Sequence, residues 1–318
     1  MTLRSPTAIV FTLALMVGLT GCGARPLSEL EQPEHAKVVL TAQPAPNAEK
    51  AAKIINGVQP NKAIAAKVPA QIRARGLNFS SSLGYPPMEM LATDGKTPIG
   101  IDIAIGRALA RVLGLNVKIT NEDFNAQIPG LLTHRYDFVM SSMTDSKERE
   151  QKVSFVDYVS AGAGFLVAQG NPQQIGGPTQ MCGKTVSVVD NGSSLALAEQ
   201  YAAECKNKNR PPIKILRMTG DQDALLALRS GRAQVNITDY VVAAGKAADP
   251  SQKVQALALP GTETPWGIAM NPDQKQLIRA MQEAVQELVA DGSYGKILAA
   301  YNVPRIAVKT VTVNGAKS

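Results

Sequence analysis

Two successive series of alternating strand and helix patterns constrain the fold of this chain more than any other feature of its sequence. The first series has a strand pattern over 72–79, a helix pattern after Gly100, strand patterns over 115–119 and 137–141, and a short helix pattern over 127–133. The helix after Gly100 is clear because apolar residues from Ile101 to Leu113 form one stripe that ends at Gly114. This alternation predicts an α/β fold around a largely parallel sheet.

The second series begins near residue 184. Strand patterns cover 185–189, 213–218 and 233–238, and helix patterns cover 195–205 and 221–229, where Asp221 is a good N-cap. A strand pattern over 266–270 and an amphipathic helix over 273–290 follow. Since a domain usually takes roughly 100–200 residues, two such series in 318 residues predict two lobes.

The start of the chain has the features of an export signal. Arg4 precedes an apolar stretch over 8–19, which is shorter than the roughly 20 residues that a transmembrane helix needs. The sequence Leu19-Thr20-Gly21-Cys22 resembles the bacterial lipobox, in which the signal is cut before the cysteine and the thiol is acylated. We therefore expect a signal peptide over 1–21, a lipid such as palmitate on Cys22, and a partly disordered tether over 22–68 that is rich in Pro and Ala.

Export decides how the remaining cysteines are interpreted. Cys182 and Cys205 are the only other thiols, and an even pair outside the cytoplasm favours a disulfide. A metal site would need more ligands, but the only histidines, His35 and His134, have no spacing relation to the cysteines. We therefore predict a disulfide and no metal site.

Composition and missing motifs exclude several classes of protein. The net charge is +7, but Lys and Arg are dispersed and aromatic residues are only 4% of the chain, so no nucleic-acid partner is expected. Phosphate-binding loops, dinucleotide-binding glycine motifs, the GxSxG motif of esterases and zinc-protease motifs are all missing. An enzyme whose site residues are scattered along the sequence stays open as an alternative.

Several short motifs occur in a specific order. The segment from Phe124 to Tyr158 contains IPGLL, Asp137, SSMTDSKER and FVDY. The other motifs are YPPM from Tyr85, GID from Gly100, Gly231-Arg232 with Asp239 seven residues after the arginine, and DGSY from Asp291. Together, over roughly 72–301, they resemble the amino-acid-binding family 3 of bacterial solute-binding proteins.

The resemblance implies a type II periplasmic-binding-protein fold, an α/β architecture with two lobes and two hinge strands. We expect lobe 1 over 69–167 and 264–303, lobe 2 over 168–263, and a C-terminal tail over 304–318. The hinge crossings are expected near 166–171 and 259–267. The ligand would then lie between the lobes, beyond the carboxyl ends of the strands.

The chemistry of a zwitterion suggests the key residues. Arg149 offers a bidentate fork to a carboxylate, although in its charged run it also suits a helix surface. Asp239 suits an ammonium, or equally the N-cap of the next helix. Hydroxyl and N–H groups would come from two loops, with Tyr85 and Phe124 as apolar walls. The remaining predicted ligand-binding residues are Ser82, Ser142, Met143, Thr144, Asn191, Ser193 and Ser194.

We therefore expect an exported, monomeric lipoprotein, in the periplasm or on the outer face of the cytoplasmic membrane, that delivers a free amino acid to the membrane subunits of an ABC importer without a cofactor. The alternatives are an exported enzyme like cyclohexadienyl dehydratase and an amino-acid sensor. Family members that take Lys or Arg often have an acidic residue just before the YPPM aromatic, whereas residues 80–84 here are uncharged. That departure favours a polar neutral or acidic ligand over a cationic one.

Overall fold

The structure is a computed structural model that describes residues 47–316. The predicted signal peptide, the lipobox with Cys22 and most of the predicted tether lie outside the described residues. No helix within residues 47–316 is long and apolar enough to cross a membrane.

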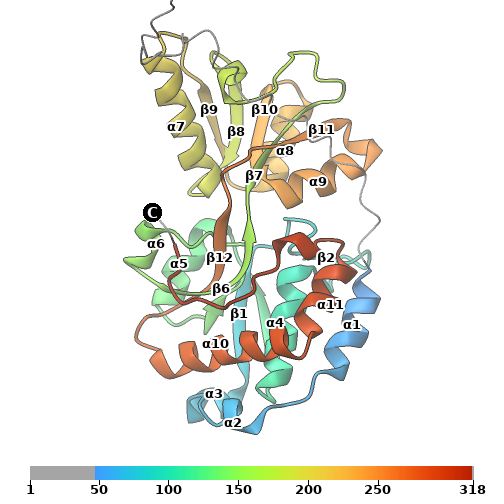
Figure 1. Cartoon of the computed structure of the whole chain (residues 1–318), viewed down its shortest axis with the longest axis vertical. Coiled ribbons are helices and arrows are strands. Elements are labelled where there is room, and N and C mark those ends of the chain that lie inside the picture. Colours follow the sequence, from blue (N-terminus) through green and yellow to red (C-terminus); the bar gives the residue numbers. More distant parts are fainter. Residues whose placement is uncertain (1–46, 317–318) are drawn as a thin grey trace, which may run out of the picture. The chain divides into compact units, whose positions relative to one another are not determined.

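Two five-stranded sheets organise the described residues into two lobes (Figure 1). In lobe 1 the strand order is β4-β1-β5-β12-β6, and in lobe 2 it is β11-β7-β10-β8-β9. In each sheet one strand pairs in parallel with two neighbours, β1 with β4 and β5, and β8 with β9 and β10. The strands that connect the lobes, β6, β7 and β12, make only antiparallel pairs. The α/β prediction is therefore confirmed, with mixed sheets.

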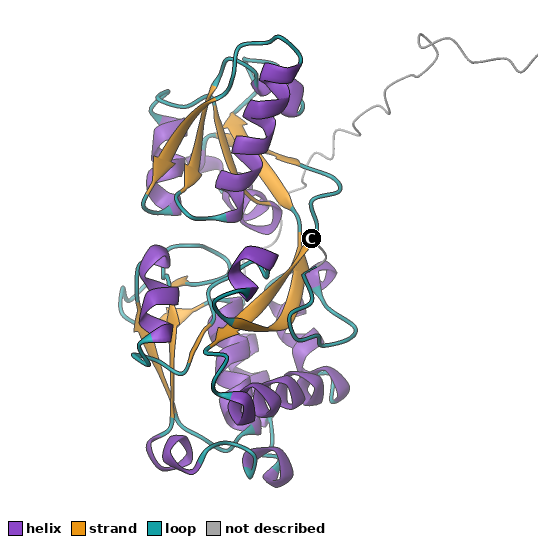
Figure 2. Ribbon diagram, turned by 90° about the vertical axis from the view of Figure 1, so that its left-hand side faces the viewer, coloured by secondary structure: helices purple, strands orange, loops and turns teal. Residues whose placement is uncertain are grey.

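The strands of lobe 1 are β1 (Leu77–Ser81), β4 (Val117–Asn121), β5 (Phe138–Val139), β6 (Ser154–Ala161) and β12 (Thr264–Met270), with a small pair, β2 (Met90–Leu91) and β3 (Pro98–Ile99). Those of lobe 2 are β7 (Ala163–Ala168), β8 (Thr185–Val189), β9 (Lys214–Met218), β10 (Val235–Asp239) and β11 (Val254–Ala258). Helices cover the faces of both sheets (Figure 2), so each sheet can be apolar on both sides.

Lobe 1 has the helices α1 (Ala48–Gly57), α2 (Lys62–Ala65), α3 (Ala70–Arg75), α4 (Ile101–Val112), α5 (Phe124–Leu132), α6 (Lys147–Glu150), α10 (Lys275–Ala290) and α11 (Ser293–Ala300). Lobe 2 has α7 (Ser193–Asn207), α8 (Asp221–Arg229) and α9 (Tyr240–Ala248), and 3₁₀ turns occur at Pro178–Met181, Pro250–Gln252 and Pro304–Ile306. The core of lobe 1 is built on α4, whose residues are nearly all buried, and on the stacked rings of Phe79 and Phe138.

The prediction of a tether up to residue 68 is wrong for the described part of that segment. Helices α1 and α2 begin at the side-chain caps Asn47 and Asn61, and their apolar residues, such as Ala51 and Ile55, are buried in the lobe 1 core. The backbone N–H of Asn47 also donates to the carbonyl of Ala300, next to α11. The expected strand from residue 72 begins as helix α3, and β1 starts only at Leu77.

The hinge crossings differ from the prediction at one point. The chain leaves lobe 1 at Gly162, between β6 and β7, and returns over residues 259–263, between β11 and β12. The first crossing thus lies several residues before the predicted 166–171. Strands β6 and β7 are both apolar, so periodicity gave no sign of the boundary between them.

The C-terminal segment is ordered along lobe 1 rather than a free tail. Residues 307 and 313 form isolated bridges to β6, the edge strand of its sheet. The hydroxyl of Thr312 and the N–H of Gly315 donate to Asp157, and the N–H of Ala316 donates to Asp145 and Glu150. We call residues 307–316 the C-terminal strap.

The predicted disulfide is present in lobe 2. Cys182 and Cys205 are joined with an S–S distance of 2.02 Å, which links the segment before β8 to helix α7. The bridge closes a loop with a sequence separation of 23, which would stabilise the lobe by roughly 3 kcal/mol in a chain-entropy model.

Candidate functional site

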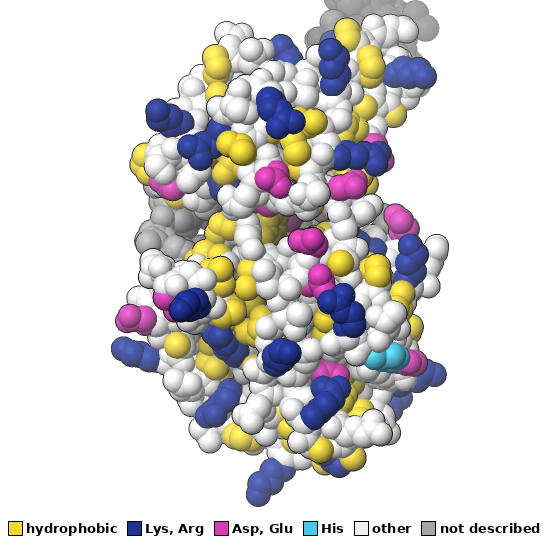
Figure 3. Space-filling model, turned by 180° about the vertical axis from the view of Figure 1, so that it is seen from behind, with side chains coloured by type: hydrophobic (Ala, Val, Ile, Leu, Met, Phe, Trp, Pro, Cys, Tyr) yellow, Lys and Arg dark blue, Asp and Glu magenta, His cyan; other side chains and the backbone are white. Residues whose placement is uncertain are grey.

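A cavity of about 380 Å³ lies between the two lobes. Lobe 1 contributes the turn after β1, the start of α5, the loop after β5, and α6; lobe 2 contributes the starts of α7 and α8 and the end of β10. On the face drawn in Figure 3, acidic side chains gather on both sides of the cleft between the lobes. Of the predicted residues, the cavity lining includes Ser82, Tyr85, Phe124, Ser142, Thr144, Arg149, Ser193, Ser194 and Asp239.

Arg149 reaches the cavity from the short helix α6, which Ser146 caps by accepting the Arg149 N–H. Its Nη1 donates to the carbonyl of Thr144 at 2.8 Å, and its Nη2 donates to the carbonyl of Asn191, in lobe 2, at 2.8 Å. The guanidinium lies 5.6 Å from the ring centre of Phe124, a cation–π geometry. Burial lowers the pKa of Arg149, so this is a partly desolvated cation and not a helix-surface charge.

Asp239 ends β10 and faces Tyr85 from across the cleft. The Tyr85 hydroxyl donates to Asp239 Oδ2 at 2.5 Å and lies 3.0 Å from Thr238 Oγ1. Tyr85 is therefore more than the apolar wall that we expected, because its polar end joins the lobes. Burial, together with repulsion from Asp221, raises the pKa of Asp239 to about 7, although the Tyr85 hydrogen bond and the charges of Arg149 and Lys246 oppose that rise. Asp239 precedes α9 but makes no capping hydrogen bond with its side chain.

A pair of buried carboxyl groups supports the loop after β5. Ser142 has a left-handed φ of 48°, and its N–H and hydroxyl both donate to Asp102 Oδ2, at 2.6 Å and 3.0 Å. Ser141 donates to Glu89 at 2.8 Å, and Tyr158 donates to Asp102 at 2.7 Å. Burial raises the pKa of both carboxyl groups, that of Glu89 well above its usual range. Both carboxyl groups accept hydrogen bonds from Ser141 or Ser142, and these contacts hold the loop at the cavity.

Two predicted residues do not line the cavity. The Met143 side chain is 1% exposed and packs in a core cluster with Leu131 and Phe155, on the other side of its loop from Ser142. Asn191 contributes its carbonyl to Arg149, and its side chain donates to Asn125 Oδ1 at 3.2 Å, in lobe 1.

The start of α7 presents backbone to the cavity through Gly192, Ser193 and Ser194. Its N-cap is Gly192, so neither serine acts as the capping residue. The N–H of Gly192 donates to the carbonyl of Val189, and the N–H groups of the first helical turn, together with the positive end of the helix dipole, favour an anionic group.

The acidic residues of the cavity were largely missed by the sequence analysis. Besides Asp239, the lining includes Glu89, Asp123, Asp221 and Asp223, against Arg149 as the single cation among the lining residues. Asp221 was predicted as an N-cap, but the N-cap is Gly220 and Asp221 is the first residue of α8. These acids come from segments other than the uncharged residues 80–84, so local sequence around the YPPM turn could not show them.

Comparison with known proteins identifies the family. Residues 77–304 match the family model of bacterial extracellular solute-binding proteins, family 3. The chain belongs to this family. The predicted family and its two-lobed type II periplasmic-binding-protein fold are thereby confirmed.

Named relatives and solved structures agree with this assignment. The chain is 28% identical to the arginine-binding protein ArgT of Corynebacterium glutamicum over 79% of the chain and 82% of the relative. It is 28% identical to the glutamine-binding protein GlnH of Bacillus subtilis over 62% of the chain and 70% of the relative. An ancestral arginine-binding protein bound to arginine superimposes with a TM-score of 0.65 at 27% identity, covering 71% of this chain and 97% of that one.

The names of the relatives bear on two predictions. The relatives are named as binding proteins for arginine, glutamine and histidine, which confirms the expectation of a binding protein rather than an enzyme. One solved neighbour is an ancestral amino-acid-binding protein described as a precursor of cyclohexadienyl dehydratase. It superimposes with a TM-score of 0.66 at 28% identity, covering 73% of this chain and 97% of that one. The expectation of a polar neutral or acidic ligand over a cationic one is weakly contradicted, because several relatives are named for arginine and histidine.

Proposed function

We propose that this protein captures a free L-α-amino acid between its lobes and presents it to the membrane subunits of an ABC importer. One observation carries the proposal: a guanidinium from lobe 1, Arg149, and a carboxylate from lobe 2, Asp239, line the same cavity. A zwitterionic amino acid has complementary charges on one carbon atom. Arg149 would hold the carboxylate with the N–H donors that Thr144 and Asn191 do not use, and Asp239 would accept from the ammonium.

The acidic lining supports a ligand with a cationic side chain. Once the zwitterion is paired, the acidic side chains of Asp123 and Asp223 stay at the exposed rim of the cavity. A cationic side chain would balance this excess, whereas an acidic one would be repelled. The relatives named for arginine and histidine give the same indication.

Closure of the lobes would couple binding to delivery. Hydrogen bonds join the lobes at four places around the cavity: Tyr85 with Thr238 and Asp239, Gln222 with the carbonyl of Gly84, Arg149 with the carbonyl of Asn191, and Asn191 with Asn125. A few hydrogen bonds contribute little net free energy, so the ligand's contacts to both lobes would supply the main difference in free energy between open and closed forms. The proposed importer would recognise the closed form.

The proposed location follows from the predicted lipobox. We propose a monomer anchored through a lipid on Cys22, on the outer face of the cytoplasmic membrane or in the periplasm. Mass spectrometry of the protein isolated from bacterial membranes would test the anchor, since a mature protein with an unmodified Cys22, or without residue 22, contradicts it.

Isothermal titration of the purified protein with L-arginine, L-histidine, L-glutamine and L-glutamate tests the binding function. We expect L-arginine or L-histidine to bind most tightly, and agmatine, which is arginine without its carboxylate, to bind at least a hundredfold more weakly than L-arginine.

An R149A variant should lose detectable binding while its thermal unfolding stays cooperative, and K152A, which removes an exposed cation of the same lobe, should bind normally. Normal binding by R149A would refute the carboxylate assignment. No binding of any amino acid to the unmodified protein would refute the proposed function.

A further inference from the structure

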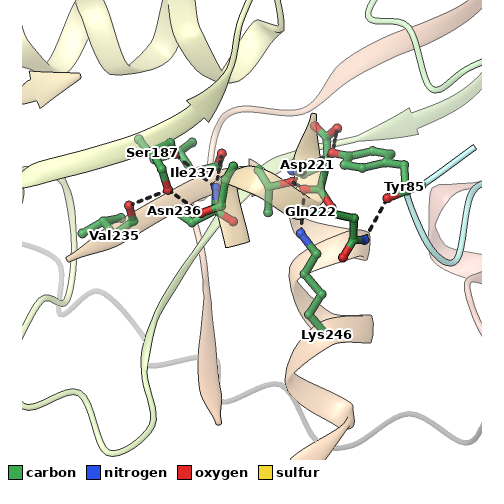
Figure 4. A network of polar contacts seen from close by, with 12 residues as sticks. Tyr85, Ser187, Asp221, Gln222, Val235, Asn236, Ile237 and Lys246 are labelled. Carbon is green, nitrogen blue, oxygen red and sulfur yellow. Dashed lines mark hydrogen bonds and ion pairs between the residues drawn. The ribbon is translucent and has the colours of Figure 1, made fainter. Parts of the chain in front are cut away.

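Lys246 is a buried cation that lies behind the cavity instead of in it. Among residues 47–316 it is the one Lys or Arg side chain that is buried as a whole, at 5% exposure, and it does not line the cavity. Its Nζ lies 2.6 Å from Asp221 Oδ1, and the two side chains are 4% and 5% exposed. Figure 4 shows Lys246 pointing from its helix toward Asp221.

The geometry of α9 explains how this lysine reaches the site. Lys246 follows Asp239 by seven residues, which is about two helical turns, so both lie on the same side of the helix. Helical side chains lean toward the N-terminus, and the long lysine stem therefore carries the ammonium back toward the cavity end of α9. There it meets Asp221, at the start of α8.

A chain of polar contacts connects this ion pair to the cleft. Asp221 Oδ1 also lies 3.4 Å from Thr238 Oγ1, which is 3.0 Å from the Tyr85 hydroxyl, and that hydroxyl donates to Asp239. The second oxygen of Asp221 is buried without a hydrogen-bond partner among the described residues. Asp221 is thus a buried carboxylate next to the one that we assign to the ligand's ammonium.

Charge balance shows why the pairing matters. The groups that act on Asp239 are Tyr85 and Arg149 from lobe 1, Asp221 from α8, and Lys246 from its own helix. Asp221 makes ionised Asp239 less favourable, and Lys246 offsets that effect. Because Arg149 belongs to lobe 1, lobe opening would withdraw its charge, whereas Lys246 moves with lobe 2 and stays.

We propose that Lys246 is a positioning residue for ligand capture: by pairing with Asp221, it increases the share of Asp239 that is ionised and available for the ammonium of the amino acid. This inference rests on the proposed function. Without Lys246, two neighbouring buried carboxylates would share lobe 2 with no cation, and one of them would take a proton at neutral pH.

The test compares K246M with the double variant D221N/K246M, which removes the whole ion pair, and with K214M, which removes an exposed cation of lobe 2. A ¹³C NMR titration of the carboxyl groups, with Asp239 assigned by D239N, follows the charge of Asp239 without any ligand. Titration calorimetry with L-arginine from pH 5 to pH 9 follows capture.

For K246M we expect the Asp239 midpoint to rise by about one pH unit and the affinity for L-arginine at pH 7 to fall about fivefold, with recovery by pH 9. In D221N/K246M the Asp239 midpoint should return to the wild-type value or below. This double variant also keeps the test possible if K246M does not fold, because it removes both charges of the ion pair. K214M should change neither.

An unchanged midpoint in K246M, or an equal loss of affinity at pH 7 and pH 9, would overturn the inference. Failure of the unmodified protein to bind any amino acid would instead refute the proposed function, and the NMR titration would still decide whether Lys246 controls Asp239.

Discussion

Acidification should weaken amino-acid binding through Asp239. Burial raises the pKa of Asp239 to about 7, so the carboxyl group is about half protonated at neutral pH. A protonated carboxyl cannot pair with the ligand's ammonium, whereas a bound ammonium would favour the ionised form and lower the pKa of Asp239 in the complex. Binding below pH 7 must therefore release a proton.

The expected loss of affinity follows from the Asp239 pKa of about 7. Each pH unit below 7 should weaken the affinity by up to about tenfold, or about 1.4 kcal/mol, until the pKa of the complex is reached. Between pH 7 and pH 5 the loss is then up to roughly a hundredfold. The folding stability of the free protein changes in the opposite direction: a raised carboxyl pKa stabilises the fold at acidic pH, and that contribution is lost as the pH rises from about 4 through about 7.

Calorimetry with L-arginine in buffers of different ionisation enthalpy measures both the binding affinity and the number of protons released on binding. We expect close to one proton released per ligand at pH 5.5, and almost none at pH 8.5. D239N should bind weakly with no pH slope. Asp145 also has its pKa raised to about 7, but it does not line the cavity, so D145N should keep the slope. A constant affinity from pH 5 to pH 8, with no proton release, would refute the assignment of Asp239.

Two further predictions test parts of the fold that lie outside the family match. I55A in α1 should lower the free energy of unfolding by roughly 2–4 kcal/mol in a denaturant titration, because Ile55 is buried in the lobe 1 core, whereas K53A, at an exposed position, should be neutral. G315A in the C-terminal strap should lower the melting temperature, since an added Cβ would collide with the Asp157 carboxylate, whereas G295A in α11 has open space and should be neutral or slightly stabilising. Unaltered stability in I55A would show that α1 is not part of the folded core, and an unchanged melting temperature in G315A would show that the strap is not held at Asp157.

The sequence predicted those elements that have a regular apolar pattern with clear ends. Strand β8 and helix α8 have the predicted bounds, 185–189 and 221–229, because each has a regular apolar period and clear ends. Helices α1 and α2 were assigned to the tether, and the start of α3 was taken for a strand, because this segment is rich in Ala, Lys and Pro and has no sustained apolar period. Short helices of this composition gain stability by packing on a lobe, and that packing is invisible to a local pattern.

For the site, the sequence predicted residues that lie within contiguous motifs. Arg149, Thr144 and Asp239 were found in this way, and all three line the cavity. The pairing of Glu89 with Asp102, and of Asp221 with Lys246, joins residues from different elements. Such pairs leave no spacing signal. The prediction about the ligand's charge, which the names of the relatives weakly contradict, considered only the residues next to Tyr85.

Both side chains that we assign to the ligand, Arg149 and Asp239, depend in part on groups that do not line the cavity. The turn that carries Arg149 also carries Glu150, which, with Asp145, accepts the N–H of Ala316 in the C-terminal strap. Asp239 in turn depends on the Asp221–Lys246 pair of lobe 2. The family match ends at residue 304, so the strap belongs to the part of this chain that the family model does not cover. Two family members with identical cavity linings can therefore differ in affinity and in pH range, and substitutions confined to the cavity lining would not reveal the cause.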